Sequence, residues 1–79
     1  MAWFSRRPSP DEIAQLGSEV AQQMDGDMTP YEANHSLIAI EAIARLIGYS
    51  NEVADDITGE AFRAWLVRTG QADLYPEIF

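Results

Sequence analysis

Four carboxylate residues in the second half of the chain, the acidic row, are spaced one to four residues apart: Glu52, Asp55, Asp56 and Glu60. On a helix, carboxylates three or four residues apart lie about 5–6 Å from one another, a separation comparable to that of successive phosphates along a nucleic-acid strand. Arginine and lysine side chains that bind phosphates would accept such a row, because carboxylates receive the same charge-assisted hydrogen bonds. Asp25 and Asp27 form a second acidic group in an earlier turn. The alternative is a solvated helical surface whose acids favour the positive end of the helix dipole.

Catalytic chemistry has little support in the sequence. His35 is the only histidine, and on a helix its neighbour Ser36 points about 100° away, so the two cannot form a catalytic pair. The chain has no lysine and no cysteine, and it lacks both a glycine-rich phosphate loop and the Gly-x-Ser-x-Gly turn of hydrolases. Carboxylate pairs alone could transfer protons, but so small a domain implies no cleft. We therefore expect no enzyme and no catalytic residue.

Two partial metal motifs fail at their diagnostic positions. Glu32 and His35 have the Glu-x-x-His spacing of di-iron bundles, which need a second such pair from another helix. Residues 25–36 begin like a calcium-binding EF-hand loop, but Pro30 stands where that loop needs glycine, and Ser36 where it needs a bidentate glutamate. A histidine at the edge of the apolar surface and a turn rich in turn-forming residues explain both segments. The sequence therefore predicts no metal site and no cofactor.

Helices must position these residues, because no strand pattern is present in the sequence. Two Ser/Thr-Pro-x-Glu segments, at 9–12 and 29–32, each combine a capping hydroxyl, a proline suited to the first helical position and a glutamate that completes a capping box. They predict helices from about Pro10 to Met24 and from about Pro30 to Ile47, the second stopped by Gly48.

Two further helices are expected after this pair. Ser50 or Asn51 can cap a short third helix through about Ile57, and a fourth is expected over about residues 59–69, with Gly70 ending it. Residues 1–8 read as an extended lead-in, and the tail over 71–79 has enough apolar residues to pack back on the core.

The helix expected at about 30–47 is the most apolar part of the chain. Its stretch 37–47, LIAIEAIARLI, leaves only a narrow polar strip, carried by Asn34, Glu41 and Arg45. A helix that is apolar nearly all round must be buried on several sides. The predicted fold is therefore all-α: one domain over residues 1–79, a small compact bundle of three to four helices around this central helix. Gly17 is expected to let the first helix approach it closely.

Charge restricts the partners. Thirteen acids and five arginines give the chain of 79 residues a net charge of −8, and residues 11–79 hold all thirteen acids with three arginines, a net of −10. Such a body repels nucleic acid and anionic membranes and attracts basic surfaces. The apolar stretch is shorter than the roughly 20 residues of a membrane span, and no secretory signal is visible. We therefore expect a cytoplasmic protein, in the host-cell cytoplasm if it is phage-encoded.

These observations favour a small acidic binding protein that inhibits a nucleic-acid-binding protein or complex by occupying its basic surface. In size and charge the chain resembles phage-encoded nucleic-acid mimics, anti-CRISPR and anti-restriction proteins among them. The acidic row would supply phosphate surrogates, Asp25 and Asp27 a second contact, and Trp3 and Phe4 apolar anchors.

Two alternatives stay open. The first is a structural or assembly subunit, because a helix too apolar for one copy to cover could be buried in a homo-oligomer or in a phage particle. The second is an antitoxin or immunity protein, which is physically a case of the inhibitor hypothesis with a basic nuclease as its partner.

Overall fold

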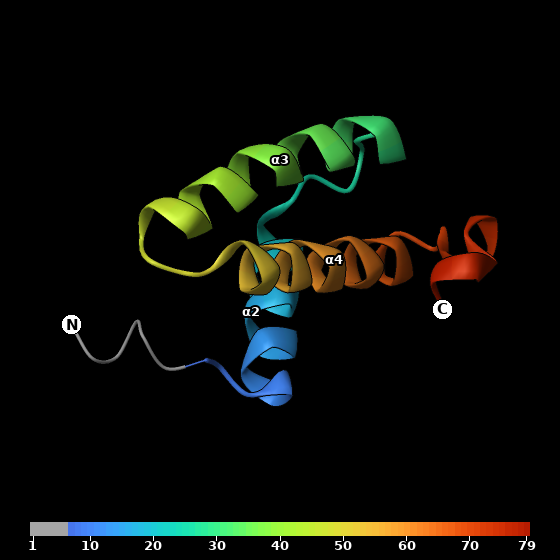
Figure 1. The fold of residues 1–79 in the computed structure, drawn as a ribbon. Coiled ribbons are helices and arrows are strands. Elements are labelled where there is room, and N and C mark those ends of the chain that lie inside the picture. The colour runs from blue at the N-terminus through green and yellow to red at the C-terminus, as the bar shows by residue number, and fades with distance from the viewer. Residues whose placement is uncertain (1–6) are drawn as a thin grey trace.

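The computed structural model describes residues 7–79, which form three α-helices followed by two short 3₁₀ helices (Figure 1). Helix α2 spans Pro10–Gln23, α3 spans Pro30–Leu46, and α4 spans Asn51–Arg68; η1 (Ala72–Leu74) and η2 (Pro76–Ile78) follow. Residues 7–79 contain no strand. The prediction of an all-α fold built as a small helical bundle is confirmed.

Helices α2 and α3 begin where the sequence predicts, each with a complete capping box and a proline in its first turn. The hydroxyls of Ser9 and Thr29 accept hydrogen bonds from the backbone N–H groups of Glu12 and Glu32 at 3.1 and 3.2 Å. Each glutamate carboxylate accepts the backbone N–H of the capping residue in return, at 3.3 and 2.9 Å. A hydroxyl cap of this kind contributes about 1 kcal/mol, so both starts are determined within four residues of sequence.

The predicted third and fourth helices are one continuous helix, α4. Ser50 caps it by accepting the backbone N–H of Val53 at 3.2 Å. The expected interruption at residues 58–59 does not occur. The Thr58 hydroxyl does not cap a new helix but donates at 3.1 Å to the backbone carbonyl four residues earlier, and Gly59 costs only about 1 kcal/mol in a helix interior. Packing along the whole length of α4 outweighs that cost.

The central helix of the bundle is α4, and the prediction that the helix at 30–47 is buried on several sides is wrong. In Figure 1, α3 lies along one side of α4, while α2 crosses α4 on another; α2 and α3 have little direct contact. Within the part of the chain that the structure describes, no further element packs on the outer side of α3. The buried residues of α3 are Ala33, Leu37 and Ala44, whereas those of α4 are Val53, Ala54, Ile57, Ala61, Trp65 and Leu66.

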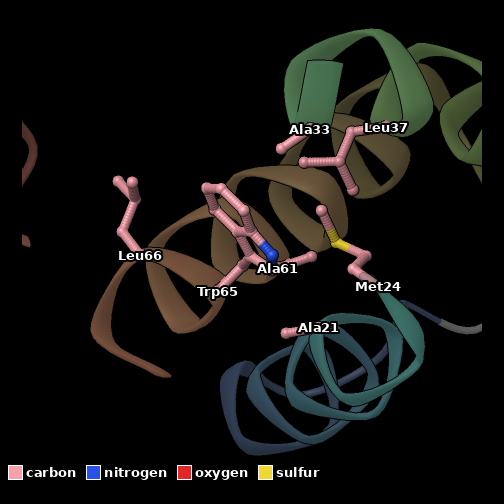
Figure 2. Packing of buried hydrophobic residues seen from close by; sticks show 7 residues of the cluster. All are labelled: Ala21, Met24, Ala33, Leu37, Ala61, Trp65 and Leu66. Atoms are coloured by element: carbon pink, nitrogen blue, oxygen red, sulfur yellow. The ribbon is translucent and has the colours of Figure 1, made fainter. Parts of the chain in front are cut away.

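The main hydrophobic cluster surrounds Trp65, which is completely buried. Figure 2 shows its indole grouped with Leu37 of α3 and with Met24, which directly follows α2. The indole N–H donates to the backbone carbonyl of Asp25 at 3.0 Å. The C-terminal segment packs on this cluster through Tyr75, whose ring meets that of Phe62 edge-on with centroids 6.0 Å apart. One side chain thus joins all three helices and the turn after α2.

Helix α2 crosses α4 at Gly17. A Cβ placed on Gly17 would lie 2.6 Å from Glu60 Cβ and 3.0 Å from the backbone nitrogen of Ala61. The absence of a side chain therefore permits the close approach, as expected for this glycine. The predicted partner is wrong: the helix that Gly17 approaches is α4, since α4 holds the centre of the bundle.

The C-terminal end of α2 is capped by a side chain from α4. Arg68 Nη2 donates to the backbone carbonyls of Ala21, at 3.1 Å, and of Met24. The last turn of α2 contains no basic residue of its own. Arg68 therefore supplies the positive charge that the negative end of the α2 dipole favours. Its hydrogen bonds also join the end of α2 to the end of α4.

Replacing Arg68 by methionine is expected to lower the free energy of unfolding by about 1–2 kcal/mol, because two carbonyls lose a charged donor while the apolar stem is kept. Arg45→Met is the matched control: Arg45 forms a surface ion pair with Glu41 at 3.6 Å, and its loss should change stability by less than about 0.5 kcal/mol. Urea denaturation of both variants measures the difference. Equal losses would show that the contact of Arg68 with α2 does not contribute.

Candidate functional site

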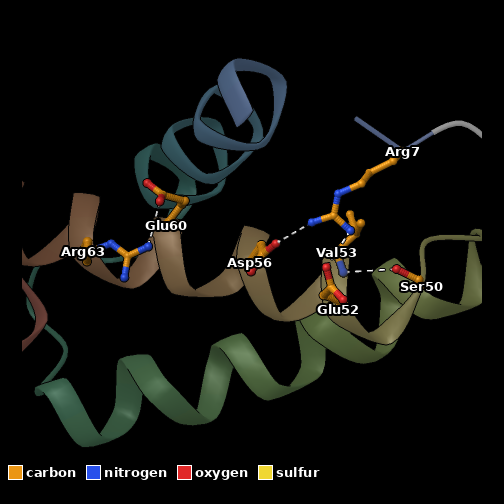
Figure 3. Close-up of polar contacts among 7 residues, drawn as sticks. All are labelled: Arg7, Ser50, Glu52, Val53, Asp56, Glu60 and Arg63. Carbon is orange, nitrogen blue, oxygen red and sulfur yellow. Dashed lines mark hydrogen bonds and ion pairs between the residues drawn. The ribbon is translucent and has the colours of Figure 1, made fainter. Parts of the chain in front are cut away.

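The acidic row lies along the N-terminal half of α4, and the structure brings together three of its four members. Glu52, Asp56 and Glu60 follow one another at intervals of four residues and share one side of the helix (Figure 3). Asp55 points away from them and lines a groove of about 200 Å³ between α4 and α3, opposite Glu41. The four carboxylates therefore present a row of three and one separate group.

Two arginines neutralise part of this row. The Arg7 guanidinium bridges Glu52 and Asp56, with Nη1 2.7 Å from Glu52 Oε1 and Nη2 3.3 Å from Asp56 Oδ2. Arg63 pairs with Glu60 at 2.7 Å from the same helix (Figure 3). Four carboxylates and two guanidinium groups leave a net charge of −2 for the acidic row and its partners. Sequence reasoning missed Arg7, which belongs to the segment before α2, and no local pattern connects it with residues 45 and 49 positions later.

The second acidic group is built into the turn after α2. Asp25 Oδ1 accepts the backbone N–H of Asp27 at 2.9 Å, which closes an Asx turn, and the Asp25 carbonyl accepts the indole N–H of Trp65. Trp65 follows Glu52 by thirteen residues, or about 20 Å along a helix. Asp25 and Asp27 are exposed, but they form an acidic surface separate from the acidic row. The proposed anchors Trp3 and Phe4 lie outside the described residues.

The outer side of α3 is a surface that sequence reasoning placed in the core. This α3 apolar face consists of five helical residues and the C-cap residue that follows them: Ile38, Ala39, Ala42, Ile43, Leu46 and Ile47. Its four large side chains are 57%, 56%, 85% and 51% exposed in chain order. The signal was present in the sequence, because these residues make α3 apolar nearly all round.

An open groove of about 420 Å³ borders the α3 apolar face. It lies between the end of α2 and α3, and its apolar lining includes Val20, Met24, Met28, Ile40 and Ile43. Ile43 belongs to both surfaces, so the apolar area of α3 continues into the groove.

His35 lies on the exposed side of α3, with its ring centroid 4.6 Å from that of Tyr31. Within residues 7–79, no three His, Cys, Asp or Glu side chains converge in a way suited to a metal ion. None of the helices described here is both long and apolar enough to cross a membrane.

Comparison with protein-family models, with curated proteins and with solved structures finds no match to this chain. Two kinds of surface among the described residues can therefore indicate a function: the acidic surfaces on α4 and in the turn after α2, and the apolar surface on α3.

Proposed function

We propose that this protein is a non-catalytic, acidic binding protein that inhibits a nucleic-acid-binding protein or complex by occupying its basic surface. The observation that carries the proposal is the bridge made by Arg7. Glu52 and Asp56 hold a guanidinium group between them at 2.7 and 3.3 Å, so their carboxylates have the spacing to hold an arginine. An arginine of the partner would take the position of Arg7 and form the same charge-assisted hydrogen bonds.

The negative charge on the rest of the chain also favours a partner with a basic surface. The whole chain carries a net charge of −8, and exposed carboxylates of Asp25, Asp27 and Asp55 lie on other parts of its surface. A field of this sign raises the association rate with a basic surface and slows association with nucleic acid itself. Anti-CRISPR, anti-restriction and antitoxin proteins are forms of this proposal that differ in the partner that is blocked.

The test compares two double substitutions that remove the same charge. Glu52→Gln with Asp56→Asn removes the arginine-binding pair, whereas Asp73→Asn with Glu77→Gln removes two exposed carboxylates from the C-terminal segment. The partner is first captured from host extract at low salt, released at about 0.5 M salt and identified. We expect the first double variant to bind it at least about tenfold more weakly and the second to bind nearly as well as the parent.

Arg7→Gln provides a further reading of the same experiment. This substitution frees the carboxylates of Glu52 and Asp56, so the affinity of the variant for the partner should rise rather than fall. Equal weakening by the two double variants would show that net charge, and not the acidic row, attracts the partner. Binding that is indifferent to salt and to all three variants would contradict the proposal.

The assembly-subunit alternative is favoured by a different observation, the exposure of the α3 apolar face. This surface contributes nothing to attraction of a basic partner, because it carries no net charge. The two candidate functions therefore predict opposite responses to salt, which separates them experimentally.

A further inference from the structure

Among the described residues, 7–79, none covers the α3 apolar face. Its most exposed member, Leu46, is 85% exposed, while Ile38, Ile43 and Ile47 are each more than half exposed. Leu37 and Ala44 on the opposite side of α3 are buried against the bundle. Contiguous apolar surface on one side of an already packed helix is typical of an interaction site.

The arrangement of side chains on this face suits a second helix of the same kind. Residues four apart form ridges along a helix, and here Ile38, Ala42 and Leu46 form one ridge, with large side chains at the ends and alanine in the middle. Ala39, Ile43 and Ile47 form the next ridge. Two copies of α3 that cross at about 50° would place the ridges of each in the grooves of the other, and Ala42 at the crossing point would let the two backbones approach.

The charge of the α3 apolar face also favours a second copy of this chain as its partner. Between residues 38 and 47 the only charged residues are Glu41 and Arg45, which pair with each other at 3.6 Å. Two copies of a chain with net charge −8 repel through their other surfaces. A contact between copies therefore requires a surface without net charge, and the α3 apolar face meets that requirement.

The area of the face is close to what a dimer needs. A standard interface buries about 800 Å² on each copy, and about 65% of a homodimer interface is apolar, or roughly 500 Å². An Ile or Leu that is more than half exposed presents on the order of 100 Å², and the face has four of them. Ala39 and Ala42 of the face, together with the exposed ring of Tyr31 from the first turn of α3, supply the remainder.

We propose that two copies of this chain associate through their α3 apolar faces, about a twofold axis that passes near Ala42. The contact is isologous, since each copy offers the same surface. It is independent of the proposed inhibitory function, because the acidic row lies on α4. A dimer formed in this way would present two acidic rows to a partner.

The test is the mass of the purified 79-residue chain in sedimentation velocity, from about 5 to about 500 µM. We expect a concentration-dependent change from 8.8 kDa to twice that mass. Raising the salt to about 0.5 M should strengthen the dimer, because it screens the repulsion between the two acidic chains. The binding of a basic partner to the acidic row, in contrast, would weaken when the salt concentration is raised.

Leu46→Glu is the decisive variant, and Leu74→Glu is its matched control. Both leucines are exposed, at 85% and 67%, so neither substitution should unfold the domain, which circular dichroism would verify. Leu46→Glu should weaken dimerisation at least about a hundredfold, and Leu74→Glu should leave it within about twofold. A parent protein that stays monomeric at the highest concentration would overturn the proposal, as would a dimer that responds equally to the two substitutions.

Discussion

Replacing Trp65 by alanine is expected to lower the free energy of unfolding by about 3–5 kcal/mol. The side chain is completely buried, and it contacts apolar residues contributed by both α2 and α3. Domains of ordinary size are stable by only about 5–15 kcal/mol, and small ones lie at the lower end. The variant should therefore be largely unfolded at physiological temperature, with loss of the helical circular dichroism signal.

Trp65→Phe separates the packing of the ring from its hydrogen bond. Phenylalanine keeps most of the apolar volume, but it leaves the Asp25 carbonyl without the indole N–H that it accepts at 3.0 Å. We expect a loss of about 1–3 kcal/mol in urea denaturation. A loss of less than about 1.5 kcal/mol in Trp65→Ala itself would be incompatible with a core centred on this residue.

The same substitution, glycine to alanine, is expected to have opposite effects at two helical positions. At Gly17 the new methyl group would lie 2.6 Å from Glu60 Cβ and within 3.0–3.1 Å of the α4 backbone. Backbone atoms of a packed helix cannot move aside as a flexible side chain can. Overpacking of this kind costs about 1–3 kcal/mol, and the gain in helix propensity offsets only roughly 1 kcal/mol of it. Gly17→Ala should therefore lower the free energy of unfolding.

At Gly59 the nearest atoms to the new methyl group are two guanidinium nitrogens of Arg63, at 3.8 and 4.0 Å. The propensity gain is then not opposed, so Gly59→Ala should raise the free energy of unfolding by about 0.5–1 kcal/mol. Chemical denaturation of both variants under identical conditions measures the two changes. Stabilisation by both substitutions would mean that Gly17 does not set the distance between α2 and α4.

The boundaries of the helices could be predicted from the sequence because the interactions that define them are local. Both capping boxes join residues three apart, and α2 and α3 each end within one residue of the predicted end. Gly48 and Gly70 adopt positive φ angles of 115° and 75° just after α3 and α4, as expected for glycines that stop helices. The expected stop before Gly59 was wrong, because a glycine in the middle of a helix is tolerated when the helix is packed.

The surfaces could be predicted only in part. The spacing of Glu52, Asp56 and Glu60 correctly places them on one side of a helix. The bridge from Arg7 could not be foreseen, since it joins segments that are distant in sequence and depends on how the chain before α2 passes α4.

The sequence by itself determined the helical class, the starts of the helices and the excess of apolar residues on α3. Only the tertiary structure decided which helix is central. Apolar periodicity measures how much surface a helix must hide, but not how many neighbours are present to hide it. The close crossing at Gly17 joins α2 to α4, and Trp65 anchors α3 on another side of α4. Residues 7–79 contain no fourth α-helix that could cover the outer side of α3, which stays exposed.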